Sequence, residues 1–249
     1  MRKAIFPLLV LAWVTTAPLW GQTAESSSKG RELLDRAIQA LGGDAFLKVK
    51  TAKFGGRVYA FSRGSLSGLA KVVEYVRYPH QRREEYGKEP DTIEIFNGDG
   101  GWTIDIHGAK PFSAEELRRY REQELMDGFH ILRYRLEEPD SWVEYAGRDF
   151  VGNRAAEVVN FTDRENRTAA FSLDAQTYLP LRVLWLRRDP ETRGRIEETE
   201  LLSNYFTAQG ITAPRHLLRQ RDGNRIFEAF IQETSYNLDL PDSLFVPPK

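Results

Sequence analysis

Cysteine is absent from the chain, and this absence excludes several classes of protein at once. There are no disulfides, no thiolate ligands for a metal, and no N-terminal cysteine of the kind that carries lipid in bacterial lipoproteins. A fold without disulfides depends on its hydrophobic core. With 249 residues, 41% of them hydrophobic, the chain is long enough to bury one.

An excess of charge of one sign is missing too. The chain has 35 Lys and Arg residues against 36 Asp and Glu residues, which does not favour nucleic acid or an anionic membrane surface as a partner. Its histidines, His80, His107, His130 and His216, are scattered, and no two have the spacing of a zinc site. We therefore predict no catalytic residue, no metal and no cofactor.

Two glycine-rich motifs resemble functional loops, but neither has the required residues. The motif "GSLSG" at 64–68 has Leu66 where a nucleophile elbow needs a central serine. The motif "NGDGG" at 97–101 lacks the Lys-Ser/Thr of a phosphate loop and the further carboxylates of a calcium loop. Both motifs are typical of turns between strands, and the second predicts a β-hairpin.

The N-terminus has the pattern of a secretory signal. Arg2 and Lys3 precede an apolar run over residues 4–14, which is followed by small residues. A retained membrane anchor is the alternative, but a spanning helix needs about 20 apolar residues and this run is shorter and contains proline. We predict a signal peptide over 1–21, cleaved near Gly21, and export to the periplasm. Residues 22–29 are then a polar linker and residues 30–249 one domain.

Two segments, 30–48 and 113–137, show helical periodicity. Gly42-Gly43 is expected to end the long helix of the first segment. Ser113 and Glu116 form a capping box at the start of the second segment, and Asp127-Gly128 is expected to divide it into two pieces. The apolar stripes are Leu34, Ile38 and Leu41 in the first segment, and Leu125, Phe129, Leu132 and Leu136 in the second.

The rest of the chain alternates with a period of two and predicts roughly ten strands. Because the links between them are short, neighbouring strands are expected to be antiparallel. The predicted fold class is therefore α+β, with a strongly curved antiparallel sheet that forms a half-open barrel. The helices are expected to cover its concave face.

Some of these strands are apolar on both faces. In "KVVEYVRY", Val72 and Val76 share one face while valine and tyrosine occupy the other, and in "PLRVLWLRR" Leu184 and Leu186 lie opposite a second apolar face. Such a strand needs two coverings. One is the core, and the other is a helix, an oligomer contact or a ligand.

Several stretches occur in an order that resembles the LolA-like superfamily of bacterial periplasmic proteins. They are "VRYPHQRREE", "FNGDGGWTID", the helical insert, "AGRDFVGNRAAEVVNF", "LDAQTYLPLRVLW", "NYFTAQGITAPR" and "YNLDLPDSLFVPP". The superfamily includes lipoprotein carriers, RseB-type regulators and mycobacterial lipid carriers. The resemblance implies a half-open barrel with a helical lid over an apolar cavity.

The resemblance also implies a role for Arg77. Lipoprotein carriers have a functional arginine at the end of an early strand, directly before a proline, and Arg77 is nearest to that place, with Tyr78 intervening before Pro79. We predict that a lipid contacts residues from the strands and the lid. The predicted lipid-binding residues are Arg77, Val72, Val76, Trp102, Ile104, Leu184, Leu186 and Phe129.

Three functional hypotheses are left open by the sequence. The first is a periplasmic protein that binds lipid, or the acyl chains of lipoproteins, as a monomeric carrier or chaperone in lipoprotein sorting or lipid transport. The second is an RseB-like sensing module that binds a protein, including an envelope membrane protein, and carries no lipid. The third is an enzyme assembled from dispersed carboxylates, for which the sequence has no signature.

Overall fold

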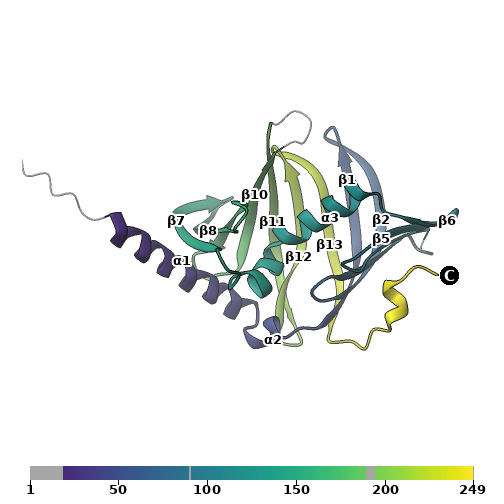
Figure 1. Cartoon of the computed structure of the whole chain (residues 1–249), viewed down its shortest axis with the longest axis horizontal. Helices are drawn as coiled ribbons and strands as arrows, with labels where there is room; N and C mark the ends of the chain where they lie inside the picture. Colours follow the sequence, from purple (N-terminus) through teal and green to yellow (C-terminus); the bar gives the residue numbers. More distant parts are fainter. Residues whose placement is uncertain (1–18, 90, 189–193, 249) are drawn as a thin grey trace, which may run out of the picture.

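One antiparallel sheet dominates the computed structural model, which describes residues 19–89, 91–188 and 194–248 (Figure 1). Thirteen strands are found in these residues, in the order β6-β5-β4-β3-β2-β1-β13-β12-β11-β10-β9-β8-β7. The strands are β1 (Thr51–Ser62), β2 (Ser65–Arg77), β3 (Gln81–Tyr86), β4 (Thr92–Phe96), β5 (Gly101–Asp105), β6 (Gly108–Pro111), β7 (Trp142–Val151), β8 (Arg154–Thr162), β9 (Thr168–Asp174), β10 (Pro180–Arg188), β11 (Arg195–Ala208), β12 (Ile211–Arg221) and β13 (Asn224–Tyr236).

The helices lie before the sheet, between its two edge strands and at the end of the chain. They are α1 (Leu19–Leu41), α2 (Asp44–Leu47), α3 (Ala114–Met126), α4 (Gly128–His130), the π-helix η1 (Ile131–Arg135) and the 3-10 helix η2 (Asp242–Phe245). Together with the sheet they form the predicted α+β fold. The sheet is curved but does not close, because the edge strands β6 and β7 do not pair with each other.

The topology explains why helices cover the concave face. Strands β1 and β13 pair in the middle of the sheet, so the chain runs outward from β1 to β6 and returns inward from β7 to β13. Strands β6 and β7 are therefore consecutive in sequence yet lie at opposite edges. The segment between them must cross the sheet, and it does so as α3, α4 and η1, residues 114–135, which we call the lid (Figure 1).

Helix α1 packs on the β7 half of the sheet. Its apolar stripe, predicted as Leu34, Ile38 and Leu41, is confirmed, since all three side chains are buried in the main core. Strands β7 and β8 supply most of the facing side chains, and Val143 and Phe161 of these strands belong to the same core.

The N-terminal boundaries differ from the expectation. Helix α1 begins at Leu19 and includes residues 22–29, which were predicted to be a linker. Few strong helix breakers occur in this stretch, and the Ser26 hydroxyl donates to the Tyr145 carbonyl of β7, 3.0 Å away. Residues 1–18 of the predicted signal peptide lie outside the described residues. In the part of the chain that the structure describes, no helix has the length and hydropathy to cross a bilayer.

The lid begins and breaks where the sequence predicts. The Ser113 hydroxyl accepts from the Glu116 backbone N–H and the Glu116 carboxylate accepts from the Ser113 N–H, which completes the capping box. Asp127 then ends α3, and its side chain accepts from the His130 N–H at the start of α4. Gly128 is needed at this break, since a Cβ there would lie 2.8 Å from the Val183 side chain of β10.

The C-terminal residues cover the part of the convex face formed by β2 and β3. Phe245 is 1% exposed, and the Arg77 guanidinium stacks on its ring with 4.8 Å between the guanidinium carbon and the ring centroid. Arg77 also donates to the Asp242 carboxylate at 2.7 Å and to the Leu240 carbonyl. The tail is therefore held against the outer side of β2 and β3.

Candidate functional site

Two adjoining cavities lie between the sheet and the lid. The larger, about 350 Å³, is bounded by β3, β4, β5, α3 and the ends of β12 and β13. The smaller, about 190 Å³, is bounded by α2, β1, β2, α4, η1, β12 and β13. Residues that line both cavities, and so form their boundary, are Arg82, Glu124, Asp127 and Arg219.

The smaller cavity has a largely apolar lining. Side chains from the sheet and from the lid contribute to it, so an occupant would be enclosed by both. The Phe46 and Phe129 rings meet edge to face at 6.3 Å, and the Phe54 and Tyr236 rings do so at 6.1 Å. The apolar lining residues are Phe46, Phe54, Val76, Tyr78, Pro79, Phe129, Ile211, Ala213, Pro214, Leu217, Ile231 and Tyr236.

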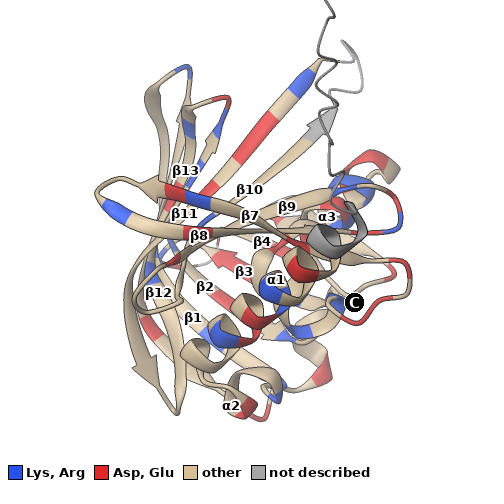
Figure 2. Cartoon of the chain, turned by 90° about the vertical axis from the view of Figure 1, so that its left-hand side faces the viewer, with Lys and Arg blue, Asp and Glu red and all other residues tan. Residues whose placement is uncertain are grey.

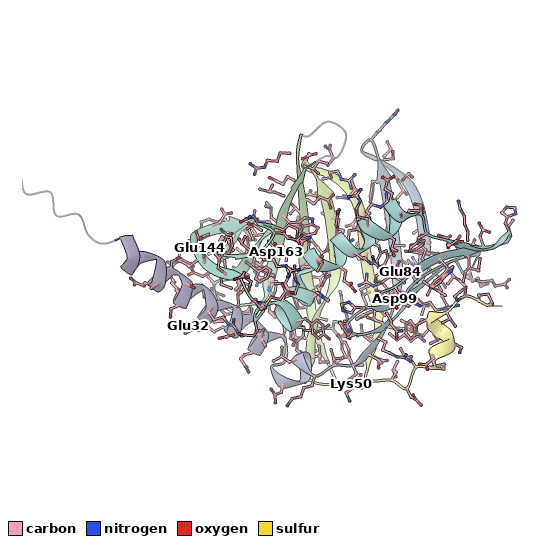
Figure 3. The ribbon with its side chains drawn as sticks, viewed as in Figure 1. Glu32, Lys50, Glu84, Asp99, Glu144 and Asp163 are labelled. Atoms are coloured by element: carbon pink, nitrogen blue, oxygen red, sulfur yellow. The ribbon has the colours of Figure 1, made fainter. Side chains whose placement is uncertain are left out.

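The larger cavity differs from the expected apolar hollow because charged side chains line it. Glu84 of β3 and Glu94 of β4 line it and stand directly opposite each other. Glu84 also stands opposite Glu74 of β2, which lines the smaller cavity. Like charges opposite one another destabilise a sheet. Figure 2 shows acidic residues on β3 in red. In Figure 3, Glu84 lies at the opposite end of the molecule from Glu32 and Glu144.

Most of these charges have partners. Arg82 Nε lies 3.1 Å from a Glu74 carboxylate oxygen, and Arg219 Nε donates to Glu200 at 2.8 Å. The Tyr86 hydroxyl donates to Glu84 at 2.9 Å. Among the described residues Glu94 has no hydrogen-bond or ion-pair partner, and it therefore stands as the exception in this group.

Burial changes the protonation of this group. It raises the pKa of Glu74 and Glu200, in each case against the attraction of an arginine, Arg82 or Arg219. Burial and the neighbouring Glu84 together raise the pKa of Glu94. Each of these carboxyl groups therefore holds its proton to a higher pH than a solvated carboxyl group does.

The lid is tied to the sheet at two places. In the middle of α3, Arg121 Nη2 donates to the Gly98 carbonyl in the β4–β5 turn at 2.8 Å. At its end, the Arg135 guanidinium forms a buried ion pair of 3.0 Å with Asp163, between β8 and β9. These contacts hold the lid across the concave face.

A pair of histidines lies at the boundary of the lid and the smaller cavity. His80 Nδ1 lies 3.1 Å from the Glu124 carboxylate of α3, and the ring centroids of His80 and His130 are 5.8 Å apart. Burial lowers the pKa of His130 to about 4, so this imidazole is neutral at physiological pH. Among the described residues, no group of three or more side chains is arranged to hold a metal ion.

The structure brings two of the predicted lipid-binding residues to a cavity. Val76 and Phe129 both line the smaller one. Val72 is buried on the same face of β2 but is not part of either lining. For these three residues, contact with a ligand stays a prediction.

The other predicted residues lie elsewhere. Trp102 and Ile104 alternate along β5 with Thr103, which lines the larger cavity, so their side chains point to the opposite face. Leu184 and Leu186 likewise alternate with Val183 and Trp185 of the core. Arg77 holds the C-terminal tail. A ligand role for these five residues also stays a prediction, and it would require the convex face.

Sequence reasoning missed the charged lining of the larger cavity. The signal was present in "QRREEYG", in which Arg82, Glu84 and Tyr86 alternate on one face of β3. Alternation shows which residues share a face but not which face is concave. Arg219 and Arg133 gave no comparable signal, because each stands among residues of mixed polarity.

Comparison with known proteins identifies the fold. No protein-family model and no curated protein matches the chain. Among solved structures, a DUF1329 family protein from Desulfovibrio piger aligns with a TM-score of 0.62 at 10% identity, over 87% of this chain and 97% of the other. A putative outer membrane lipoprotein-sorting protein domain from Vibrio parahaemolyticus aligns with a TM-score of 0.59 at 9% identity, over 88% and 97%.

A third solved structure carries the superfamily name itself. It is a LolA superfamily protein from Nitrosomonas europaea, with a TM-score of 0.54 at 11% identity, over 87% of this chain and 97% of that one. At such low identity the likeness concerns the fold. It confirms the half-barrel architecture that the sequence resemblance implied.

Proposed function

We propose that this chain, whose fold is that of the LolA superfamily, is an exported periplasmic protein that binds the acyl chain of a lipid or lipoprotein and catalyses no reaction. The observation that carries the proposal is the smaller cavity, whose apolar lining comes from both the sheet and the lid. The secretory pattern at the N-terminus supports the compartment. The likeness to a putative lipoprotein-sorting domain is consistent with this role.

Burial of hydrocarbon alone can supply the affinity. Each methylene moved out of water contributes about 0.8 kcal/mol, so a chain of about six methylenes gains about 5 kcal/mol before the costs of binding. A volume of about 190 Å³ corresponds to about six water molecules at liquid density and suits a short chain or part of a longer one. A carrier of this kind needs a closed apolar site and a lid that can open.

Neighbouring leucines of β12 provide a matched test. Leu217 lines the smaller cavity, whereas Leu218 points to the other face of the same strand. We expect Leu217→Trp to fill the cavity and to weaken octanol binding by roughly tenfold or more, and Leu218→Trp to leave it unchanged. Isothermal titration calorimetry on delipidated protein measures both. Equal affinities in the two variants would contradict the proposed site.

The native protein offers an independent measurement. Protein purified from the periplasm without detergent is expected to yield lipid on organic extraction, and mass spectrometry would identify that lipid. A wild-type protein that carries no extractable lipid and binds no octanol would overturn the proposal. In that case a protein-binding role of the RseB-like kind would become the better hypothesis.

A further inference from the structure

Arg133 of η1 is held in an unusual way at the wall of the smaller cavity. Its guanidinium carbon lies 4.2 Å from the centroid of the Phe46 ring and 4.4 Å from that of the Tyr78 ring. Its Nε donates to the Phe46 carbonyl at 3.1 Å. Stacking on the two rings and one hydrogen bond therefore fix the plane of the guanidinium, and both terminal nitrogens remain available as donors.

The other charges of the smaller cavity already have partners. Glu74 pairs with Arg82, and Glu124 pairs with His80. Asp127 accepts from the backbone of α4, and Arg219 pairs with Glu200. No carboxylate among the described residues forms an ion pair with Arg133, which makes it the one cation of this lining that lacks an anionic partner there.

We propose that Arg133 binds the anionic head group of a single-chain amphiphile whose hydrocarbon chain occupies the smaller cavity. This inference rests on the proposed function and names the class of ligand. A guanidinium presents parallel N–H donors that match the two oxygens of a carboxylate or phosphate group. Because stacking on Phe46 and Tyr78 orients it in advance, little side-chain freedom is lost when the anion binds.

The charges on either side of the cavity fix the orientation of this ligand. At the boundary with the larger cavity, Arg82 and Arg219 are already paired with glutamates, whereas Arg133 stands unpaired beside α2 and the β2–β3 turn. The head group therefore lies at the Arg133 end. The chain contacts the apolar rings and aliphatic side chains that line the same cavity.

The first experiment compares head groups on one chain length with the wild-type protein. Octanoate, octyl phosphate, octanol and octylamine are titrated into the delipidated exported protein by calorimetry near neutral pH and at low salt. We expect octanoate or octyl phosphate to bind about tenfold more tightly than octanol, and octylamine to bind no better than octanol. The ratio of octanoate to octyl phosphate distinguishes a fatty acid from a phosphate-bearing lipid.

The second experiment changes the arginine. Arg133→Gln removes the charge and is expected to abolish the preference for the anions while octanol binding persists. Arg133→Lys keeps the charge but not the planar fork, and is expected to retain part of the preference. Arg118→Gln on α3 is the matched control, because Arg118 is exposed and its one ion-pair partner among the described residues is Glu122 on the same helix. That control is expected to behave like the wild type.

The outcomes separate this inference from the proposed function. If octanol binds as tightly as the anions, or if octylamine binds best, the Arg133 assignment is overturned while the acyl-chain site stands. If none of the ligands binds, both proposals fail. Should Arg133→Gln fail to fold, the wild-type series and Arg133→Lys still decide the question, since the preference for anions must be present in the first and reduced in the second.

Discussion

At the scale of single residues, the concave face contains titratable groups whose pKa is shifted by burial. Glu94 is the clearest case, because it has no hydrogen-bond or ion-pair partner among the described residues and stands opposite Glu84. Its raised pKa means that the folded state holds a proton that the unfolded state has released. The charged form of Glu94 therefore destabilises the fold at neutral pH, and this cost disappears as the pH falls below the pKa of the unfolded chain.

Glu94→Gln is accordingly expected to stabilise the protein at neutral pH by about 0.5 kcal/mol, the size of a cross-strand like-charge contact. The gain should shrink toward zero near pH 4, where the carboxyl group is protonated in both states. Thermal unfolding across a pH series measures it. Glu89→Gln, at an exposed position in the β3–β4 turn, is the control and should show no gain. A gain independent of pH would contradict the assignment.

His130 is expected to give the free energy of unfolding the opposite pH dependence, a decrease as the pH falls. Its pKa is lowered to about 4 by burial, whereas a solvated histidine has a pKa of about 6.5. Between these values the unfolded chain binds a proton that the folded chain excludes, so the free energy of unfolding decreases as the pH falls through this window.

The test compares the unfolding temperatures of His130→Gln and the wild type across that window. The wild type should lose stability relative to the variant by an amount of the order of 1 kcal/mol as the pH falls. His107→Gln, at an exposed turn, is the control and should track the wild type. Parallel curves for the His130 variant and the wild type would show that burial does not displace this pKa.

At the scale of elements, the lid packs closely on the sheet at Gly128, where there is no room for a side chain. A Cβ at Gly128 would lie 2.8 Å from Val183 and 3.2 Å from Phe171. Gly128→Ala is therefore expected to destabilise the protein by about 1–3 kcal/mol through overpacking. Denaturant unfolding measures the loss. Gly68→Ala in β2 is the control, since its Cβ would meet only Ala60 at an ordinary 3.6 Å. Similar losses in both variants would mean that the lid does not press on the core there.

Prediction from the sequence succeeded best for individual elements. The stripe of α1, the capping box of α3, the break at Asp127 and the turn after Asn97 each depend on residues close in sequence, and all four are present. The start of α1 was missed because polar residues such as Ser26 are helical here through a contact with β7, which is distant in sequence.

The candidate site was harder to predict than the fold. A strand with apolar residues on both faces does not reveal which face is concave, and this is why Leu184 and Trp102 were predicted to line a cavity. The pairing of three glutamates across β2, β3 and β4 depends on strand register, which no local pattern determines. Arg133 has no local signal in the sequence, because the rings that it contacts, Phe46 and Tyr78, come from segments distant in sequence.

At the scale of the whole molecule, the C-terminal tail packs on the convex face over β2 and β3. Phe245→Ala removes a fully buried ring and its stacking with Arg77, so we expect a loss of about 3 kcal/mol in the free energy of unfolding. Val246→Ala, at a side chain that is 47% exposed, should change it by less than about 0.5 kcal/mol. Chemical denaturation measures both variants, and equal effects would mean that the tail adds no stability.

The pairing of β1 with β13 has a consequence for how the protein folds. These strands come from opposite ends of the chain, yet they form the seam at the centre of the sheet. Contacts between residues so far apart in sequence require the closure of a very long loop before they gain any energy, which slows folding. Refolding is therefore expected to begin independently in the two hairpin arrays that flank this seam. Amides of β1 that bond to β13 should be among the last to acquire protection in pulsed hydrogen exchange.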